Sequence, residues 1–413
     1  MEDRQEGMTL EIEQKIRRSI LQQVDLSRDI SDQEIIAMIQ REICQMDECK
    51  SMVIEQRLVL QNRIFNSLRK LDVLQDLLED DAITEIMING YDHIFVEREG
   101  HIYETHQQFS SKEKLDDIVQ QIVASNNRIV NEAVPIVDTR LADGSRVNIV
   151  LPPASVDGSI ISIRKFPKEA MTMQRLIELH SLSEEVSEFL QQLVIAGYNV
   201  FISGGTGSGK TTFLNALTEY IPDDQRVITI EDSAELQLQG VKNLVRLEAR
   251  NSNLEGMLEI TIRDLVRTSL RMRPDRIIVG ECRGAEALEV LQAANTGHDG
   301  GISTGHGNSP QDMLSRLETM VLMAGMELPV NAIRKQIASG IDILIHLGRL
   351  RDKSRKVLNI SEVVGMHDGE VELQTLYEFV PQEEYKSRVR GIWKQRNPLE
   401  HTGKLVRAGI KIS

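Results

Sequence analysis

Aromatic residues are scarce in this 413-residue chain: they make up 4% of it, and Trp393 is its one tryptophan. Proteins that bind single-stranded nucleic acid stack the bases on exposed aromatic rings, so this shortage argues against such a platform. The charge balance points the same way, because 48 Lys and Arg against 63 Asp and Glu give a net charge of -15. An acidic protein is a poor non-specific binder of phosphate backbones, and we expect no nucleic-acid partner.

Cysteine is also rare, and long apolar runs are absent from the sequence. The three cysteines, Cys44, Cys49 and Cys282, show no metal-binding spacing and too few pairs for a disulfide framework, which suits a reducing cytoplasm. The first residues are charged, so we expect no secretory signal. No stretch approaches the roughly 18 apolar residues that a membrane span needs. If the chain serves a membrane machine, we expect it to do so from the cytoplasmic face.

The length predicts two or three domains of roughly 100–200 residues each. Residues 1–70 contain no proline and repeat isoleucine at three- and four-residue spacing, which predicts a helical region. Residues 71–168 mix strand-like and helical pieces, including a hairpin with its turn at Glu99 and Gly100, and are predicted to form an α+β domain. After a linker over 169–185, short apolar strands alternate with helices over 186–380, which indicates a mostly parallel sheet covered on both faces.

Residues 381–413 are predicted to form a basic C-terminal tail. From residue 386 onward, Glu400 is the one acid among eight basic residues, namely Lys386, Arg388, Arg390, Lys394, Arg396, Lys404, Arg407 and Lys411. Two interpretations stay open. The segment is a solvated tail, or it docks on an acidic partner or on anionic lipid heads, which would give peripheral membrane association.

Residues 204–211 read G-G-T-G-S-G-K-T and fit the phosphate-loop pattern G-x-x-x-x-G-K-[ST]. Glycines let the backbone fold around a phosphate with its N–H groups pointing inward, and the helix that follows adds its positive end. We expect Lys210 to reach the β- and γ-phosphates of ATP and the Thr211 hydroxyl to ligate Mg²⁺. The remaining predicted nucleotide contacts are Gly205, Thr206, Gly207, Ser208, Gly209 and Thr212. A glycine-rich turn that merely resembles the motif is the alternative.

Two acidic segments follow predicted strands. The apolar run 277–279 leads through Gly280 to Glu281, which is predicted to orient the attacking water and to bind Mg²⁺ through water. Glu231 follows another strand within an acidic stretch that includes Asp232 and Glu235, and carboxylates at this edge of a parallel sheet suit a Mg²⁺–phosphate site. The alternatives are that Glu281 is an ordinary surface glutamate and that the Glu231 segment starts a helix, whose dipole favours acidic residues.

Two histidines lie in a glycine-rich stretch. His298 and His306 could suggest zinc, but no cysteine lies nearby and their spacing is not that of a helical pair. An imidazole that senses the γ-phosphate is the better functional interpretation. A structural histidine is the alternative for either one.

In order along the chain, the phosphate loop, the Glu231 segment, the strand ending in Glu281 and the two Thr-Gly-His segments resemble the type II/type IV secretion ATPase superfamily. Its four nucleotide motifs are Walker A, the Asp box, Walker B and the His box. Several stretches look closest to the CpaF-type ATPases of tight-adherence (Flp) pilus systems: 140–147, 270–275, 281–287, 295–300 and 317–325. The likeness covers about residues 75–408. Residues 300–307 are richer in glycine than the usual form of the His box.

The resemblance implies a RecA-like ATPase domain preceded by a smaller, PAS-like α+β domain, with six chains in a ring and ATP between the two domains. It implies catalytic roles for Lys210, Glu231, Glu281 and His306, nucleotide contact by His298, and Mg²⁺ binding by Thr211, Glu231 and Glu281. Arg140, Arg146 and Arg164 become candidates to reach the phosphates from the smaller domain, because guanidinium grips phosphate oxygens bidentately. Surface salt bridges are the alternative role for these three arginines.

The expected function is therefore ATP hydrolysis that moves one domain against the other and drives an inner-membrane platform protein of a pilus or secretion machine. A conjugation or effector-secretion ATPase of the same superfamily would differ in its partners rather than its chemistry. A DNA-directed motor and a non-hydrolysing nucleotide-binding scaffold are further alternatives. The acidic charge argues against the motor, and the intact Lys210, Thr211 and Glu281 argue against the scaffold.

Overall fold

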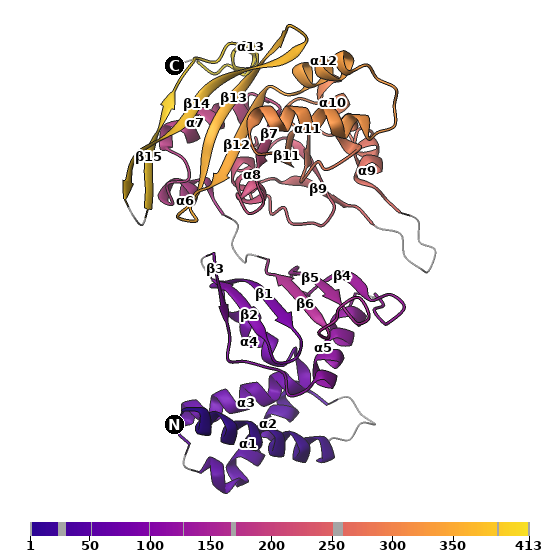
Figure 1. The fold of residues 1–413 in the computed structure, drawn as a ribbon, viewed down its shortest axis with the longest axis vertical. Coiled ribbons are helices and arrows are strands. Elements are labelled where there is room, and N and C mark those ends of the chain that lie inside the picture. Colours follow the sequence, from indigo (N-terminus) through magenta and orange to yellow (C-terminus); the bar gives the residue numbers. More distant parts are fainter. Residues whose placement is uncertain are drawn as a thin grey trace. The chain divides into compact units, whose positions relative to one another are not determined.

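The computed structural model describes residues 2–23, 30–50, 52–98, 100–126, 128–166, 171–250, 259–385 and 388–411. The chain divides into two compact units, Met1–Lys168 and Glu169–Ser413, and each is described by itself (Figure 1). Three predictions fall partly on residues outside the described ranges: the hairpin turn at Glu99, the start of the linker, and Lys386 of the predicted tail.

The N-terminal unit begins with three helices, α1 (Glu2–Gln23), α2 (Asp32–Gln45) and α3 (Ile54–Arg69), with a short 3₁₀ turn at Asp47–Cys49. Ser31 starts α2 with a capping box, since its hydroxyl accepts from the Glu34 N–H while the Glu34 carboxylate accepts from the Ser31 N–H. Ile16, Ile39 and Ile64, one from each helix, are fully buried in a shared core. The predicted helical region is confirmed.

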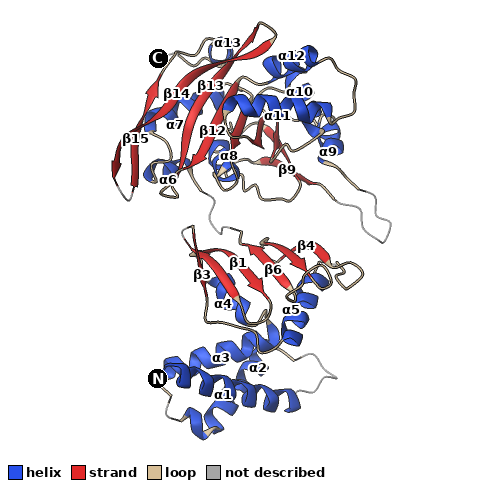
Figure 2. Ribbon diagram, viewed as in Figure 1, coloured by secondary structure: helices blue, strands red, loops and turns tan. Residues whose placement is uncertain are grey.

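The rest of this unit is a six-stranded antiparallel sheet in the order β3-β2-β1-β6-β5-β4. Its strands are β1 (Ile83–Asn89), β2 (Ile94–Arg98), β3 (His101–Glu104), β4 (Ile136–Arg140), β5 (Arg146–Val150) and β6 (Ile160–Arg164). Helices α4 (Val73–Glu79) and α5 (Lys112–Ala124) pack on one face, where alternate strand residues such as Ile86, Ile149 and Ile163 are buried (Figure 2). The α+β fold is confirmed, and its PAS-like character stays a prediction.

The C-terminal unit is built on a nine-stranded sheet in the order β15-β14-β13-β12-β7-β11-β10-β8-β9. The six strands from β12 to β9 are parallel: β7 (Val200–Gly204), β8 (Arg226–Glu231), β9 (Asn243–Glu248), β10 (Arg276–Val279), β11 (Ile302–His306) and β12 (Ile343–Arg349). The central strands are buried almost throughout, as expected for a sheet covered on both faces.

Two groups of helices cover this sheet. One core packs α6 (Met173–Glu178), α7 (Glu184–Ile195), α8 (Lys210–Thr218) and α13 (Gly403–Arg407) against one face. The other packs α9 (Ile262–Ser269), α10 (Glu286–Asn295), α11 (Pro310–Leu322) and α12 (Val330–Gly340) against the opposite face. The predicted layering of the α/β unit is confirmed.

The sheet also continues past residue 380 as an antiparallel extension that the sequence analysis did not predict. Strands β13 (Arg355–His367), β14 (Glu370–Tyr385) and β15 (Arg388–Gln395) follow β12 in order. Residues 388–395 of the predicted tail are therefore an edge strand, and the ring of Trp393 packs against that of Phe379 in a tilted arrangement, with 5.0 Å between centroids. Over the described ranges, every helix is too short or too polar to cross a membrane.

Candidate functional site

The glycine-rich loop joins the buried strand β7 to helix α8, as the phosphate-loop pattern predicts. Gly205, Thr206 and Gly207 at its tip are exposed, whereas Ser208 and Lys210 are buried. Gly207 and Gly209 have φ of 70° and 92°, a region that glycine enters without steric cost. The Ser208 hydroxyl oxygen is buried and has no hydrogen-bond partner within the described residues. An exposed backbone tip at the start of α8 fits an anionic phosphate.

Gly204, at the end of β7, has no room for a side chain. A Cβ there would lie 2.5 Å from the Ser208 hydroxyl and 2.6 Å from the backbone oxygen of Leu347 on the neighbouring strand β12. At the adjacent Gly205, a Cβ would meet nothing within 4 Å. The loop is therefore seated tightly at Gly204 and open at Gly205.

We expect Gly204→Ala to destabilise the C-terminal unit by about 1–3 kcal/mol, because a backbone carbonyl on a packed strand cannot move aside cheaply. Urea unfolding of the nucleotide-free protein, followed by the fluorescence of Trp393, reports on this unit. Gly205→Ala is the matched control and should leave the unfolding midpoint nearly unchanged. Equal unfolding midpoints for the two variants would show that a Cβ at Gly204 meets no steric obstacle.

Lys210 is the first residue of α8 and turns back onto its own loop. Its Nζ donates to the carbonyl oxygens of Gly204 and Gly205 at 3.1 Å each and lies 3.3 Å from Nδ1 of His306. Burial and the charge of Lys210 lower the pKa of His306 below its ordinary value, so the ring is neutral near pH 7 and its Nδ1 accepts from the ammonium. Lys210 and His306 therefore meet at the end of two adjacent strands, β7 and β11.

Glu281 follows β10, the next strand in the sheet, and belongs to the same cluster. Its Oε1 lies 2.8 Å from Nε2 of His306. That contact lacks hydrogen-bond geometry even though Nε2 carries the ring proton, so the buried Oε1 accepts no hydrogen bond within the described part of the chain. The other oxygen, Oε2, accepts from Nε and Nη2 of Arg283 at 2.8 and 2.6 Å.

Glu231 ends β8, the strand beside β10, and its side chain is 4% exposed. Its Oε1 accepts from the backbone N–H groups of Glu235 and Leu236 at 2.8 and 2.9 Å, which fixes the loop after β8 rather than starting a helix. Its Oε2 is buried without a hydrogen-bond partner in the described ranges. Desolvation by burial raises the pKa of Glu231 to about 7, against the two backbone hydrogen bonds that lower it.

The raised pKa of Glu231 predicts how the stability of the fold depends on pH. A carboxyl that holds its proton more tightly in the folded state makes the fold lose stability as pH rises from about 4.5 to about 7. Glu231→Gln keeps an oxygen for the two backbone donors but cannot ionise. We expect the variant to gain up to about 3 kcal/mol over the wild type above pH 7, a gain that shrinks as the pH falls.

The measurement is a pH series of urea unfolding followed by Trp393 fluorescence. Glu378→Gln, which removes one side of an exposed ion pair with Arg396 in the same unit, controls for the loss of a surface charge. A stability difference between Glu231→Gln and the wild type that stays constant with pH would contradict the raised pKa.

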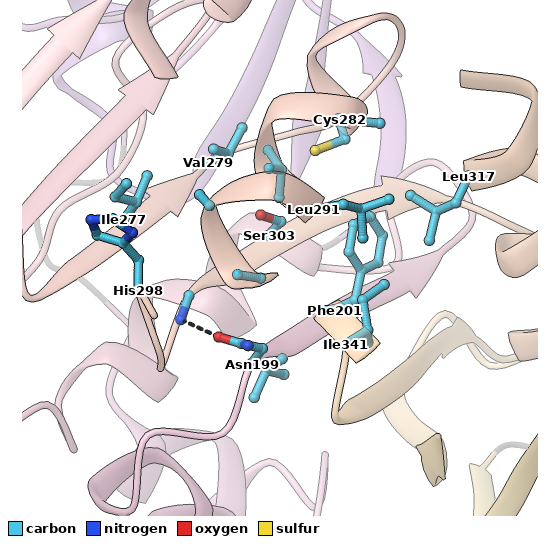
Figure 3. Close-up of a pocket in the computed structure, with 17 residues that line it drawn as sticks. Asn199, Phe201, Ile277, Val279, Cys282, Leu291, His298, Ser303, Leu317 and Ile341 are labelled. Carbon is cyan, nitrogen blue, oxygen red and sulfur yellow. Dashed lines mark hydrogen bonds between the residues drawn. The ribbon is translucent and has the colours of Figure 1, made fainter. Parts of the chain in front are cut away.

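The structure corrects the prediction that His298 binds the nucleotide. His298 precedes β11, whose Ile302 pairs with Val200 at the start of β7, while His306 pairs with Gly204 at its end. His298 therefore lies at the opposite edge of the sheet from the phosphate loop. Its side chain lines a small, mostly apolar cavity with Ile277 and Cys282 (Figure 3). The Thr-Gly-His pattern occurs twice, but one copy enters the strand and the other ends it.

The three predicted arginines of the N-terminal unit occupy neighbouring positions on its sheet. Arg140 pairs with Arg146 across β4 and β5, and Arg146 pairs with Arg164 across β5 and β6. Directly paired residues project from the same face, and here that face is the one opposite α4 and α5. Arg164 is exposed and the other two are half-buried. Their contact with a nucleotide stays a prediction.

Two arginines near the loop were missed by the sequence analysis. Arg283 holds Glu281, and the spacing Glu-x-Arg after a strand is a signal that could have been noticed. Arg355, at the start of β13, donates from Nε to the carbonyl oxygen of Gly207 at 2.9 Å. No local pattern could have found Arg355, because it lies 148 residues away in sequence.

The described side chains of this site do not form a complete metal-binding set by themselves. In the described ranges, no group of three His, Cys, Asp or Glu side chains could hold a metal ion by itself. The residues nevertheless fit Mg²⁺ shared with phosphates, which takes one or two protein oxygens and keeps several waters. Thr211, half-buried in the first turn of α8, and the open oxygens of Glu231 and Glu281 are oxygen donors of that kind.

A strand, glycine-rich loop and helix, one strand removed in the sheet from a strand that is followed by Gly-Glu, define a P-loop protein with a RecA-like fold. The chain belongs to the type II/IV secretion system protein family, whose profile matches residues 67–396. The finer likeness to CpaF-type ATPases stays a prediction.

Individual relatives agree with this family. A putative conjugal transfer protein of Mycobacterium tuberculosis is 32% identical over 311 residues, which span 74% of this chain and 87% of that protein. The type IV secretion system protein VirB11 of Brucella suis is 32% identical over 311 residues, spanning 67% of this chain and 84% of the relative. Among solved structures, the ATPase DotB of Legionella pneumophila has 25% identity and a TM-score of 0.51 over 70% of this chain and 79% of its own.

Proposed function

We propose that this chain is a Mg²⁺-dependent ATPase that works as a homohexamer at the cytoplasmic face of a membrane and powers a type II/IV secretion or pilus machine. One observation carries the proposal. Lys210, His306, Glu281 and Glu231 come from the ends of β7, β11, β10 and β8, four strands that are consecutive in the sheet. Ligands of open α/β sheets bind at this carboxyl edge.

Each residue of this row has a role that its chemistry supports. The loop amides and Lys210 would bind the β- and γ-phosphates of ATP, and Thr211 with Glu231 and Glu281 would hold Mg²⁺ directly or through water. The ion would supply neutralisation of the charge that develops on the phosphate oxygens. The open Oε1 of Glu281 can accept a hydrogen bond from the attacking water. Neutral His306, between Lys210 and Glu281, can report whether the γ-phosphate is present.

The arginine row supports a role for the N-terminal unit. Three guanidinium groups at directly paired positions on one face of the sheet suit a polyanionic ligand such as a triphosphate. We propose that Arg140, Arg146 and Arg164 bind the phosphates in the assembled ring and let go after hydrolysis, which moves the PAS-like domain against the ATPase domain.

The pilus and conjugation versions of this proposal share their chemistry and differ in their partners. The relatives named above are conjugal transfer and type IV secretion proteins, which favours the conjugation or secretion version, while the CpaF-type motifs favour Flp pilus assembly. The genes beside this one discriminate: pilin and platform genes support the pilus, and a coupling protein with a relaxase supports conjugation. A DNA-directed motor would require strong stimulation of ATP hydrolysis by DNA at physiological salt.

The experiment is a direct assay of the purified chain. We expect it to bind Mg-ATP, to hydrolyse it, and to run as a particle of six 46.7 kDa chains with a nonhydrolysable ATP analogue, as measured by light scattering. Replacing all three arginines with Gln should leave binding to the phosphate loop in place but lower turnover. A folded protein that does not bind Mg-ATP would refute the proposal.

A further inference from the structure

We propose that Arg283 is a positioning residue for the hydrolysis reaction: it anchors one oxygen of Glu281 so that the other faces the attacking water. This inference rests on the proposed function of Glu281. It gives a role to an arginine that belongs neither to the phosphate loop nor to the arginine row of the N-terminal unit.

The contacts around Glu281 separate its two oxygens. Nε and Nη2 of Arg283 both donate to Oε2, at 2.8 and 2.6 Å, so the guanidinium fork fixes that oxygen from two directions. Oε1 is buried and takes no hydrogen bond within the described residues, although Nε2 of His306 lies 2.8 Å away. The carboxylate therefore has one anchored oxygen and one open oxygen.

A buried acceptor left without a hydrogen bond carries a free-energy cost. Such a cost is expected at a site where a ligand or a water completes the bonding, and Oε1 lies at the strand edge where the γ-phosphate is expected. Rotation of the Glu281 carboxylate would exchange the two oxygens. Because Arg283 holds Oε2 with two N–H groups, it prevents that exchange and fixes the direction of the open lone pair.

Glu231 shows the same arrangement with a different anchor. Its Oε1 takes two backbone N–H groups and its Oε2 is buried and open within the described ranges. Two neighbouring strand ends thus each present a carboxylate that is fixed by one oxygen. Backbone N–H groups hold the carboxylate of Glu231, whereas the side chain of Arg283 holds that of Glu281. A side chain can be replaced without disturbing the fold.

The local surroundings hold Arg283 in place. Its backbone N–H and that of Gly284 donate to the Glu286 carboxylate at 2.6 and 2.9 Å, which fixes the turn before α10. Its Nη1 lies 4.0 Å from Asp232, on the loop after β8. The side chain itself is 62% exposed, and exposed ion pairs contribute little to stability. Losing the guanidinium should therefore affect catalysis much more than folding.

The test uses the full-length chain at saturating Mg²⁺. We expect Arg283→Gln to lower kcat for ATP by about 10- to 100-fold, the usual effect of removing a group that orients an active-site ligand. KM and the affinity for a fluorescent ATP analogue should stay within about twofold, since the phosphate loop is untouched. Arg283→Lys keeps the charge but has one donor atom instead of a fork, so it should recover kcat in part.

Arg396→Gln is the matched control. Arg396 forms an exposed ion pair with Glu378 at 2.9 Å on β14, and its loss should leave kcat unchanged. The unfolding midpoint of Arg283→Gln, followed by Trp393 fluorescence, should match that of the wild type and exclude a folding defect as the cause.

The possible results separate this inference from the proposed function. If Glu281→Gln abolishes turnover while Arg283→Gln does not, the positioning role is wrong and the role of Glu281 stands. If neither variant loses turnover, Glu281 itself is misassigned. A rise in kcat for Arg283→Gln would show that the arginine restrains Glu281 instead of aiming it. Parallel losses of nucleotide affinity and kcat would mean that it acts on binding.

Discussion

The variant Glu281→Gln is expected to hydrolyse ATP about 100- to 10,000-fold more slowly than the wild type while still binding it, the range seen when a positioned base is removed. The amide has nearly the shape of the carboxylate, and its oxygen can still accept from Arg283. What is lost is the charge and the open Oε1 acceptor that would orient water. Because Lys210 and the loop amides are unchanged, the affinity for Mg-ATP should fall little.

Turnover and affinity have to be measured separately for this variant, by phosphate release and by equilibrium binding of a fluorescent ATP analogue. Glu378→Gln, an exposed carboxylate outside the site, is the control and should match the wild type in both assays. Hydrolysis by Glu281→Gln at the wild-type rate would remove Glu281 from its role. Loss of binding together with turnover would show that its main contribution is to hold Mg²⁺.

The parts of the fold that follow from local sequence patterns were predicted correctly. The apolar segments around residues 200, 228 and 278 form buried parallel strands because each is a short β-branched run between turn residues. The phosphate loop could be placed between such a strand and a helix because its glycines can adopt the positive φ values that this tight turn uses, 70° at Gly207 and 92° at Gly209. Lys210, His306 and Glu281 could be grouped from sequence, since parallel strands end at a common edge.

Features that depend on register or on distant residues could not be predicted. Strands β13 to β15 carry many charged residues, and each pairs with the strand before it, starting from β12, so their place in the sheet is decided by these pairings rather than by a local apolar pattern. His298 lies before β11, whereas His306 is its last residue. The glycines around both histidines make the bounds of this strand hard to predict from sequence. Glu231 was recognised as an acid at a strand end, but its bonds to the Glu235 and Leu236 amides depend on the shape of the loop.

Replacing Lys210 with Ala is expected to have the largest effect on binding. Its ammonium is buried and donates to Gly204 and Gly205 at the start of the loop. Charge-assisted hydrogen bonds contribute about 1.5–3 kcal/mol each, so losing two to the phosphates weakens binding by about 100-fold or more. Turnover should fall to background, since the γ-phosphate would lose its main cation.

The same substitution should leave the fold intact, which distinguishes a binding defect from unfolding. Without nucleotide, Lys210 is a buried charge held by two carbonyl oxygens, so removing it relieves a desolvation cost that offsets the loss of those two hydrogen bonds. The unfolding midpoint reported by Trp393 should therefore change little. Lys242→Ala removes a lysine from an exposed ion pair with Asp223 in the same unit and serves as the control. Normal Mg-ATP affinity in Lys210→Ala would mean that this loop does not bind the phosphates, and the roles assigned to Glu281 and Arg283 would fall with it.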